Sequence, residues 1–198
     1  MNWIVSETEF DPTKLHHKET VFTLGNGYLG TRGAFEEGYP GAQPATLIHG
    51  VFDDVPVVYT ELANCPDWLP IYIIVEGERF RLDQGTLLAY RRELDVQRGV
   101  LSRDVCWRSP GGHTLDLHFE RFASLADEHV VAICCEITAV EKPCTVAVQA
   151  GINGYPDNMG VLHWTWFDQG VDAGTAWLHT RTRHSGLTLG MAMRMVAR

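Results

Sequence analysis

Positive charge is scarce in this sequence: 16 Lys and Arg residues stand against 25 Asp and Glu residues, which gives a formal net charge of −9. A surface of this sign repels nucleic acid and anionic lipid, so we expect neither as a partner. Apolar runs are short as well, and none approaches the about 18 residues that a membrane-spanning helix needs. The amino terminus lacks the basic start and apolar stretch of a signal peptide. We therefore expect a cytoplasmic protein.

Sequence signals for metal binding and disulfide bonding are also missing. The five cysteines are odd in number and form no CxxC pair, which excludes a disulfide framework and a cysteine-rich zinc site. The nine histidines fit no zinc pattern such as HExxH. We expect no metal and no cofactor. The remaining composition, 45% hydrophobic and 21% charged, is typical of a folded domain.

Alternating apolar and polar residues dominate the chain. Leu115, Leu117 and Phe119 alternate with polar residues, which indicates a half-buried strand. Residues 71–75 and 78–82 around Glu76-Gly77 predict a tight hairpin. Further strands are expected at 46–52, 99–107, 129–138, 144–152, 161–167, 175–183 and 187–196. Helical signals are thin, and the best is a short amphipathic stretch at 87–94. Many short strands separated by Gly, Pro and Asx turns predict an all-β sandwich or barrel.

We interpret residues 1–198 as one continuous domain, since no linker, repeat or low-complexity tract divides them. The last expected strand runs almost to Arg198, which suggests that the domain is truncated at its carboxy-terminal end.

Residues 25–30 (GNGYLG) match the GxGxxG pattern of dinucleotide-binding sites. Such a site needs a helix directly after the glycines, because its N–H groups bind the pyrophosphate. Here Gly33, Gly38, Pro40 and Gly41 follow and break any helix within a few turns. The pattern therefore predicts tight turns rather than a nucleotide site.

The same glycines belong to a set of five ordered motifs, at residues 19–38 (ETVFTLGNGYLGTRGAFEEG), 50–53 (GVFD), 61–69 (ELANCPDWL), 94–103 (LDVQRGVLSR) and 121–129 (RFASLADEH). Together they resemble the amino-terminal part of glycoside hydrolase family 65, which includes maltose, trehalose, kojibiose and nigerose phosphorylases. The departures are modest: Phe52 stands for Tyr, Val96 for Met and Gln97 for Arg. After about residue 140 the likeness fades.

This resemblance implies an antiparallel β-supersandwich of the galactose-mutarotase-like type with little helix. Family members perform their chemistry in an α/α barrel that this chain lacks, where a glutamic acid protonates the leaving oxygen. Inorganic phosphate is the co-substrate in the phosphorylases, and water attacks in the hydrolases. The resemblance thus implies that these residues carry no catalytic group and are inactive alone. Their partners would be the barrel, its disaccharide substrate and, in a homodimer, a second copy.

Several residues are candidates for the surface that faces the barrel and its sugar pocket: Asn26, Arg32, Glu36, Glu37, Asn64 and Trp68. The alternative is that they hold turns and satisfy buried backbone groups. Trp164 and Trp166 share one face of an expected strand, where they form either a sugar-stacking platform or part of the core. Asp53-Asp54 is either a carboxylate pair or a turn.

Two other functions remain open from the sequence. One is a stand-alone carbohydrate-binding β-sandwich that uses the two tryptophans. The other is an aldose-epimerase-like enzyme, since that activity occurs on a similar supersandwich.

Overall fold

The structure is a computed structural model that describes residues 3–55 and 58–198, without the side chains of Trp166 and Phe167. Strands are its main secondary structure, as predicted. The helical elements are η1 (Pro12–Lys14) and α1 (Leu15–Val21). The strands are β1 (Ile4–Glu7), β2 (Leu24–Gly25), β3 (Leu29–Thr31), β4 (Thr46–Ile48), β5 (Phe52–Val55), β6 (Tyr59–Leu62), β7 (Ile71–Val75), β8 (Glu78–Arg79), β9 (Thr86–Asp95), β10 (Val100–Arg108), β11 (Thr114–Ala123), β12 (Val131–Ala139), β13 (Val146–Ala150), β14 (Trp164–Asp172), β15 (Thr175–Thr182) and β16 (Thr188–Arg194).

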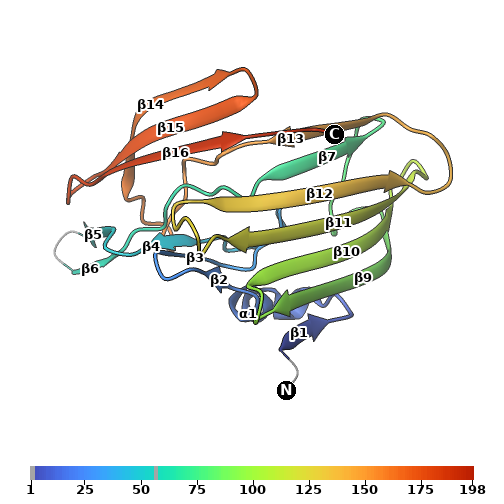
Figure 1. Cartoon of the computed structure of the whole chain (residues 1–198), viewed down its shortest axis with the longest axis horizontal. Coiled ribbons are helices and arrows are strands. Elements are labelled where there is room, and N and C mark those ends of the chain that lie inside the picture. The colour runs from blue at the N-terminus through green and yellow to red at the C-terminus, as the bar shows by residue number, and fades with distance from the viewer. Residues whose placement is uncertain (1–2, 56–57) are drawn as a thin grey trace.

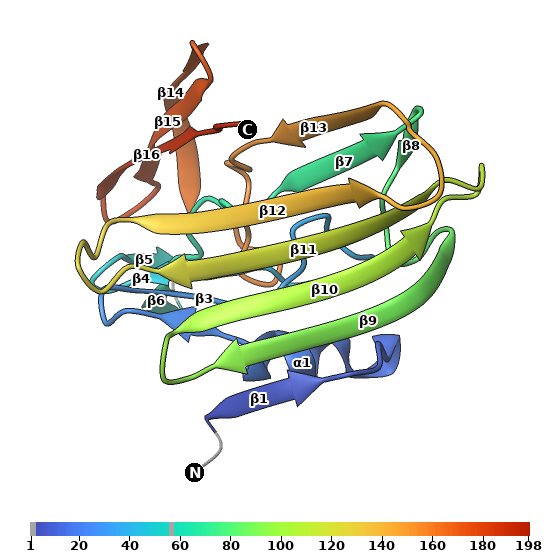
Figure 2. The same cartoon turned by 45° about the vertical axis from the view of Figure 1, so that its right-hand side comes forward.

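The largest sheet has the strand order β1-β9-β10-β11-β12, and every neighbouring pair in it is antiparallel. Smaller sheets join β13-β7-β8, β14-β15-β16, β2-β3-β4 and β5-β6. Figure 2 shows the large sheet as a curved layer, with α1 and the short strands behind it and β14–β16 rising at one end. The predicted antiparallel all-β class is confirmed.

The core lies on the inner face of the large sheet. In β11, Leu115, Leu117 and Phe119 are buried, while the residues between them point away from the core. Phe80 packs edge-on against Trp107 at a ring separation of 5.3 Å. These side chains belong to one cluster with β7, so the alternation in the sequence correctly located the buried face.

Glu76 and Gly77 both have positive φ angles, 47° and 87°, in the turn between β7 and β8. This geometry matches the twist of a tight two-residue hairpin, as predicted. The GxGxxG residues also form a hairpin, in which Gly25 pairs with Gly30. A Cβ on Gly25 would lie 3.1 Å from the Leu29 carbonyl oxygen, so the close backbone approach explains this glycine.

The prediction of a short amphipathic stretch at 87–94 was wrong, because these residues lie in β9. Tyr90, Arg92 and Leu94 alternate inward along that strand. The sequence obscured this pattern because one inward residue is an arginine. The α-helix lies instead at Leu15–Val21, after a 3-10 turn whose preceding residue, Asp11, accepts a hydrogen bond from the Thr13 N–H at 2.9 Å.

The β5–β6 hairpin lies at the same end of the molecule as the β14–β16 sheet (Figure 1). Residues separated by more than 100 positions in the sequence meet there through hydrogen bonds. No helix in the described part of the chain is long and apolar enough to cross a bilayer.

Candidate functional site

Two carboxylates lie on one face of the β5–β6 hairpin. Asp53 and Glu61 are direct cross-strand partners, and the Asp53 side chain is fully buried. Like charges directly opposite each other destabilise a sheet. A group that hydrogen-bonds to both carboxylates and lies between them relieves this repulsion.

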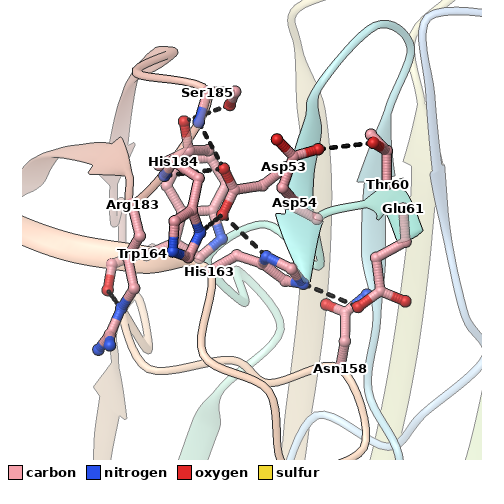
Figure 3. A network of polar contacts seen from close by, with 12 residues as sticks. Asp53, Asp54, Thr60, Glu61, Asn158, His163, Trp164, Arg183, His184 and Ser185 are labelled. Carbon is pink, nitrogen blue, oxygen red and sulfur yellow. Dashed lines mark hydrogen bonds and ion pairs between the residues drawn. The ribbon is translucent and has the colours of Figure 1, made fainter. Parts of the chain in front are cut away.

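His163 supplies that group, from the residue just before β14. Its Nδ1 lies 2.9 Å from Asp53 Oδ2 and its Nε2 lies 2.8 Å from Glu61 Oε1 (Figure 3). Each ionised carboxylate only accepts hydrogen bonds, and an imidazole donates through both nitrogens only as the imidazolium ion. The His163 ring therefore joins the two carboxylates, with one ring nitrogen within hydrogen-bond distance of each.

Asp53 also fixes the turn between β15 and β16. Its Oδ1 accepts hydrogen bonds from the backbone N–H groups of His184, at 3.0 Å, and Ser185, at 2.7 Å. Burial alone would raise the pKa of Asp53, but the Ser185 N–H, the His163 ring and the His184 N–H outweigh it and hold that pKa far below its usual value. Asp53 is thus ionised and joins three segments of the chain.

The His163 ring at the centre of this network is closed to substrate. The His163 side chain is only 1% exposed, and both of its ring nitrogens face carboxylates of the chain itself. A general acid or base must reach the proton that it transfers, directly or through one water. The arrangement therefore suits positioning of the hairpin better than proton transfer to a sugar.

Trp164 follows His163 and is fixed by a second set of contacts. Its Nε1 donates to the Asn64 carbonyl oxygen at 2.6 Å. The Asn64 side chain in turn donates to the Asp157 carbonyl at 3.1 Å, and the Asn64 N–H donates to Asn158 Oδ1 at 2.8 Å. Asn64 thus connects the loop after β6 with the segment that leads into β14.

A pocket of about 230 Å³ opens beside this connection. Its lining comes from the segment before β14, from the start of β14 and from the residue after β15: Gly154, Tyr155, Pro156, Leu162, Trp164, Thr165 and Arg183. Trp164 and Arg183 also border the Asp53 network, as Figure 3 shows. The pocket and the network therefore share one scaffold.

Of the two predicted sugar-stacking residues, the structure describes the side chain of Trp164. Trp164 is 7% exposed, so most of its ring packs in the core, where it joins the cluster of Leu29, Ile48 and Ala63. It nevertheless contributes to the pocket wall. The side chain of Trp166 lies outside the described part of the chain.

Glu36 and Glu37 lie in the interior of the sandwich. Arg103 binds both, with Nη2 2.8 Å from Glu36 Oε2 and 2.5 Å from Glu37 Oε2, and Arg121 Nη1 lies 3.0 Å from Glu36 Oε1. Burial would raise the pKa of Glu36, but Arg121 and Arg103 together hold it below its usual value. A third buried arginine, Arg92, lies beside this group and bonds the Gly33 carbonyl. These contacts suit the structural alternative for both glutamates.

The other predicted residues of the barrel-facing set also hold local structure. The Arg32 Nη2 lies 3.2 Å from Glu19 Oε2, and its backbone N–H donates to the Ala45 carbonyl. Asn26 accepts hydrogen bonds from the N–H groups of Tyr28 and Leu29, which closes the glycine hairpin.

Trp68 differs from these residues. Its Nε1 is buried without a hydrogen-bond partner among the described residues.

The sequence interpretation missed His163 and His184 and did not identify Asp53 as a buried residue that joins three segments of the chain. One signal was present: Asp53 ends the GVFD motif, and Glu61 begins the next motif. No group of three or more His, Cys, Asp or Glu side chains in the described residues is arranged to hold a metal ion.

The sequence matches the family model described as "Glycosyl hydrolase family 65, N-terminal domain" over residues 5–198. The chain belongs to glycoside hydrolase family 65. This family 65 domain is 42% identical over 187 residues to a kojibiose phosphorylase of Halothermothrix orenii, covering 94% of this chain and 24% of that protein. It is 34% identical over 173 residues to an α,α-trehalose phosphorylase of Thermoanaerobacter brockii, covering 80% of this chain and 22% of that protein.

A solved structure described as a putative kojibiose phosphorylase from the human microbiome has the same fold. Its TM-score is 0.89 at 22% sequence identity, and the match covers 97% of this chain and 27% of that one. The family 65 domain thus spans about a quarter of the length of the relatives it matches. The predicted supersandwich of this family is confirmed.

Proposed function

We propose that this chain is the amino-terminal domain of a phosphorylase that acts on an α-glucosyl disaccharide. The observation that carries the proposal is the 42% identity to a kojibiose phosphorylase over 94% of this chain. Trehalose and nigerose phosphorylases match as well, at 34% and 32% identity. Phosphorolysis, with inorganic phosphate as co-substrate, is therefore favoured over hydrolysis, and the disaccharide is one with an α-linked glucosyl unit.

The domain's own role is non-catalytic. The acid that protonates the leaving oxygen comes from the barrel, and the phosphate, which is already an anionic nucleophile, needs no base from this chain. Support comes from the closed network around His163, in which neither ring nitrogen is available to a substrate. The same closure makes an aldose-epimerase activity at this cluster unfavourable.

The β5–β6 hairpin is part of the surface that packs against the barrel and shapes its pocket. It exposes three large apolar side chains: Phe52, Val58 and Tyr59. Phe52 is paired with Leu62 and Tyr59 with Val55, so the register places the two aromatic rings on opposite faces of the hairpin, and each face offers apolar contact to a partner. Asp53 anchors the hairpin to the β15–β16 turn, so the surface is held rigidly and loses little freedom on docking.

Two measurements on this chain test the proposal. The purified chain is incubated with phosphate and kojibiose, trehalose or nigerose, and glucose 1-phosphate is assayed. We expect no release above the no-protein background, because positioning and proton donation, which supply most of the rate, come from the barrel. Release at a rate proportional to the chain's concentration would contradict the non-catalytic role.

The second measurement is association. The kojibiose phosphorylase of Halothermothrix orenii is expressed without the segment that matches this chain, and its sedimentation is followed as this chain is added. We expect a complex of one chain per barrel. A Phe52→Asp variant should weaken the complex, whereas Leu125→Asp, at an exposed apolar residue elsewhere, should not. Equal weakening by both variants, or no complex at all, would contradict docking through the hairpin.

A further inference from the structure

The pocket beside Trp164 has the size and lining of a small sugar site. We propose that it binds one pyranose ring of a neutral sugar. Its volume is about 230 Å³. Pockets for drug-sized ligands begin near 300 Å³. The space therefore suits one sugar ring rather than a longer oligosaccharide or a nucleotide.

The walls offer apolar contact for the C–H faces of such a ring. Tyr155 is 66% exposed at the pocket, and Trp164, Pro156 and Leu162 complete the apolar part of the lining. Aromatic side chains present large, rigid apolar faces with few rotatable bonds. A pyranose ring has C–H groups on its faces and hydroxyl groups around its rim, so apolar walls contact the faces and leave the rim to polar groups.

Arg183 supplies the polar contact. Its Nε donates to the Trp164 carbonyl oxygen at 3.3 Å, which positions the guanidinium group at the pocket. No hydrogen bond from its two terminal nitrogens is found within the part of the chain that the structure describes. Those nitrogens form a fixed fork of donors that suits two neighbouring sugar hydroxyls.

A single cation in a mostly apolar lining favours a neutral ligand. Arg183 is the one charged residue among the lining residues given above. An anion such as phosphate, once removed from water, needs several donors or opposing charges. A neutral sugar ring needs hydrogen-bond partners only for the hydroxyl groups around its rim. The lining therefore selects a sugar over a phosphate ion.

The pocket is held in shape by residues of the 61–69 motif. The N–H of Asp67 donates to the Asn153 carbonyl at 2.9 Å, and the Asn153 N–H donates back to the Asp67 carbonyl at 2.8 Å. The Asn64 side chain donates a hydrogen bond to the Asp157 carbonyl, and the Asn64 carbonyl accepts one from the Trp164 indole N–H. Asn64 is thus a positioning residue for the pocket. A wall fixed in advance reduces the entropy lost on binding.

This inference deepens the proposed function, because the substrates proposed for the whole enzyme contain glucosyl rings. The two remain separable in experiment. Binding at this pocket is measured without a barrel, whereas docking and phosphorolysis need one.

The test is a nuclear magnetic resonance titration of the ¹⁵N-labelled chain with methyl α-glucoside. We expect saturable shifts, in the millimolar range typical of a single small ring, at the Trp164 indole N–H and the amides of Gly154 and Thr165. Sorbitol has similar hydroxyl groups but no ring, and it should give no saturable shift. Inorganic phosphate should give none either, since one guanidinium cannot replace its hydration.

Two variants each remove one of the proposed contacts with the sugar. Tyr155→Ala should weaken binding about three- to tenfold, the range expected for loss of an aromatic contact. Arg183→Ala should weaken binding by a similar factor. Arg181→Ala is the matched control: it removes an exposed arginine two residues away that does not line the pocket, and it should leave the affinity unchanged. Each variant's remaining amide spectrum reports that the fold is retained.

Three results would overturn the proposal. The first is the absence of a saturable shift with methyl α-glucoside. The second is equal binding of sorbitol, or saturation by phosphate in its place. The third is an affinity unaffected by Tyr155→Ala and Arg183→Ala in variants whose remaining spectra match the parent chain.

Discussion

Asp53 and Glu61 lie directly opposite each other on β5 and β6, and their carboxylates bind the two nitrogens of one imidazole, that of His163. Either carboxylate would repel the other without the ring between them. The hairpin, the segment before β14 and the β15–β16 turn are therefore held together by one buried group of charges.

Asp53→Asn should destabilise the chain by about 3–5 kcal/mol, because it removes one partner of a buried, hydrogen-bonded charge pair. The neighbouring Asp54 is the matched control, since it is exposed and its carboxylate accepts a hydrogen bond from the Thr60 hydroxyl (Figure 3). Asp54→Asn should change stability by no more than about 0.5 kcal/mol. Urea unfolding of the three proteins measures both values, and equal losses in the two variants would contradict the role of Asp53.

The stability of the chain should fall in acid, and Asp53 should account for part of the fall. Its pKa in the folded state lies below the ordinary value of 3.8. A depressed carboxyl pKa contributes stability that is complete above the unfolded pKa and is lost as the pH falls through the folded one. The loss of stability should therefore begin near pH 4 and continue below it. Glu36 should add to this loss, because its pKa is also lowered in the folded chain.

Urea unfolding of the chain and of Asp53→Asn from about pH 5 to pH 2 measures this dependence. The slope should be shallower in the variant, because the substituted amide does not titrate. Identical slopes for the two proteins would show that the ionisation of Asp53 does not contribute to the pH dependence of stability.

Much of the fold could be predicted from the sequence. The strands of the large sheet from β10 to β12 lie within a residue or two of their expected ranges, because apolar alternation there reports burial directly. The 76–77 turn followed from its glycine. β9 was missed because Arg92 is buried among apolar neighbours, and its contacts to the Gly33 carbonyl and the Phe22 ring come from distant segments.

The candidate site was less accessible to sequence reasoning. Asp53 and His163 are 110 positions apart, and no local pattern links an acidic residue in one hairpin with a histidine before another strand. Arg32 illustrates the same difficulty. Arg32 pairs with Glu19 on α1, while Arg103 of β10 binds Glu36 and Glu37, the acidic residues nearest to Arg32 in the sequence.

Arg103→Leu should destabilise the chain by about 3–5 kcal/mol, because it leaves Glu36 and Glu37 buried without their main partner. Arg91→Leu is the control. Arg91 also forms an ion pair, with Glu93 at 2.7 Å, but this pair is largely exposed and should contribute about 0–1 kcal/mol. Thermal and urea unfolding measure the difference, and a small loss for Arg103→Leu would show that the glutamates find other partners.

The chain should self-associate at micromolar concentration. β16 pairs with β15 on one side, and no described strand pairs with its other side. Met195 and Val196, just beyond this edge strand, are exposed. An unpaired edge with apolar neighbours is a template for pairing, and a two-fold dimer is the commonest closed form.

Light scattering of the chain and of Val196→Lys measures this association. A dimer mass that falls to the monomer mass in the variant is expected, since a charge at an edge blocks pairing. Leu125→Lys, at an exposed residue elsewhere, should leave the dimer intact. A monomer mass for the unaltered chain would contradict the prediction.

The central claim is that this domain supports a phosphorylase barrel. Its most direct test joins residues 5–198 of this chain to the Halothermothrix orenii kojibiose phosphorylase in place of that enzyme's matching segment. Phosphate-dependent release of glucose 1-phosphate from kojibiose is then compared with release by the barrel alone. We predict that the joined protein is active, that the barrel alone has little or no activity, and that release stops without phosphate. An inactive joined protein that is folded, or a barrel equally active without the domain, would contradict the claim.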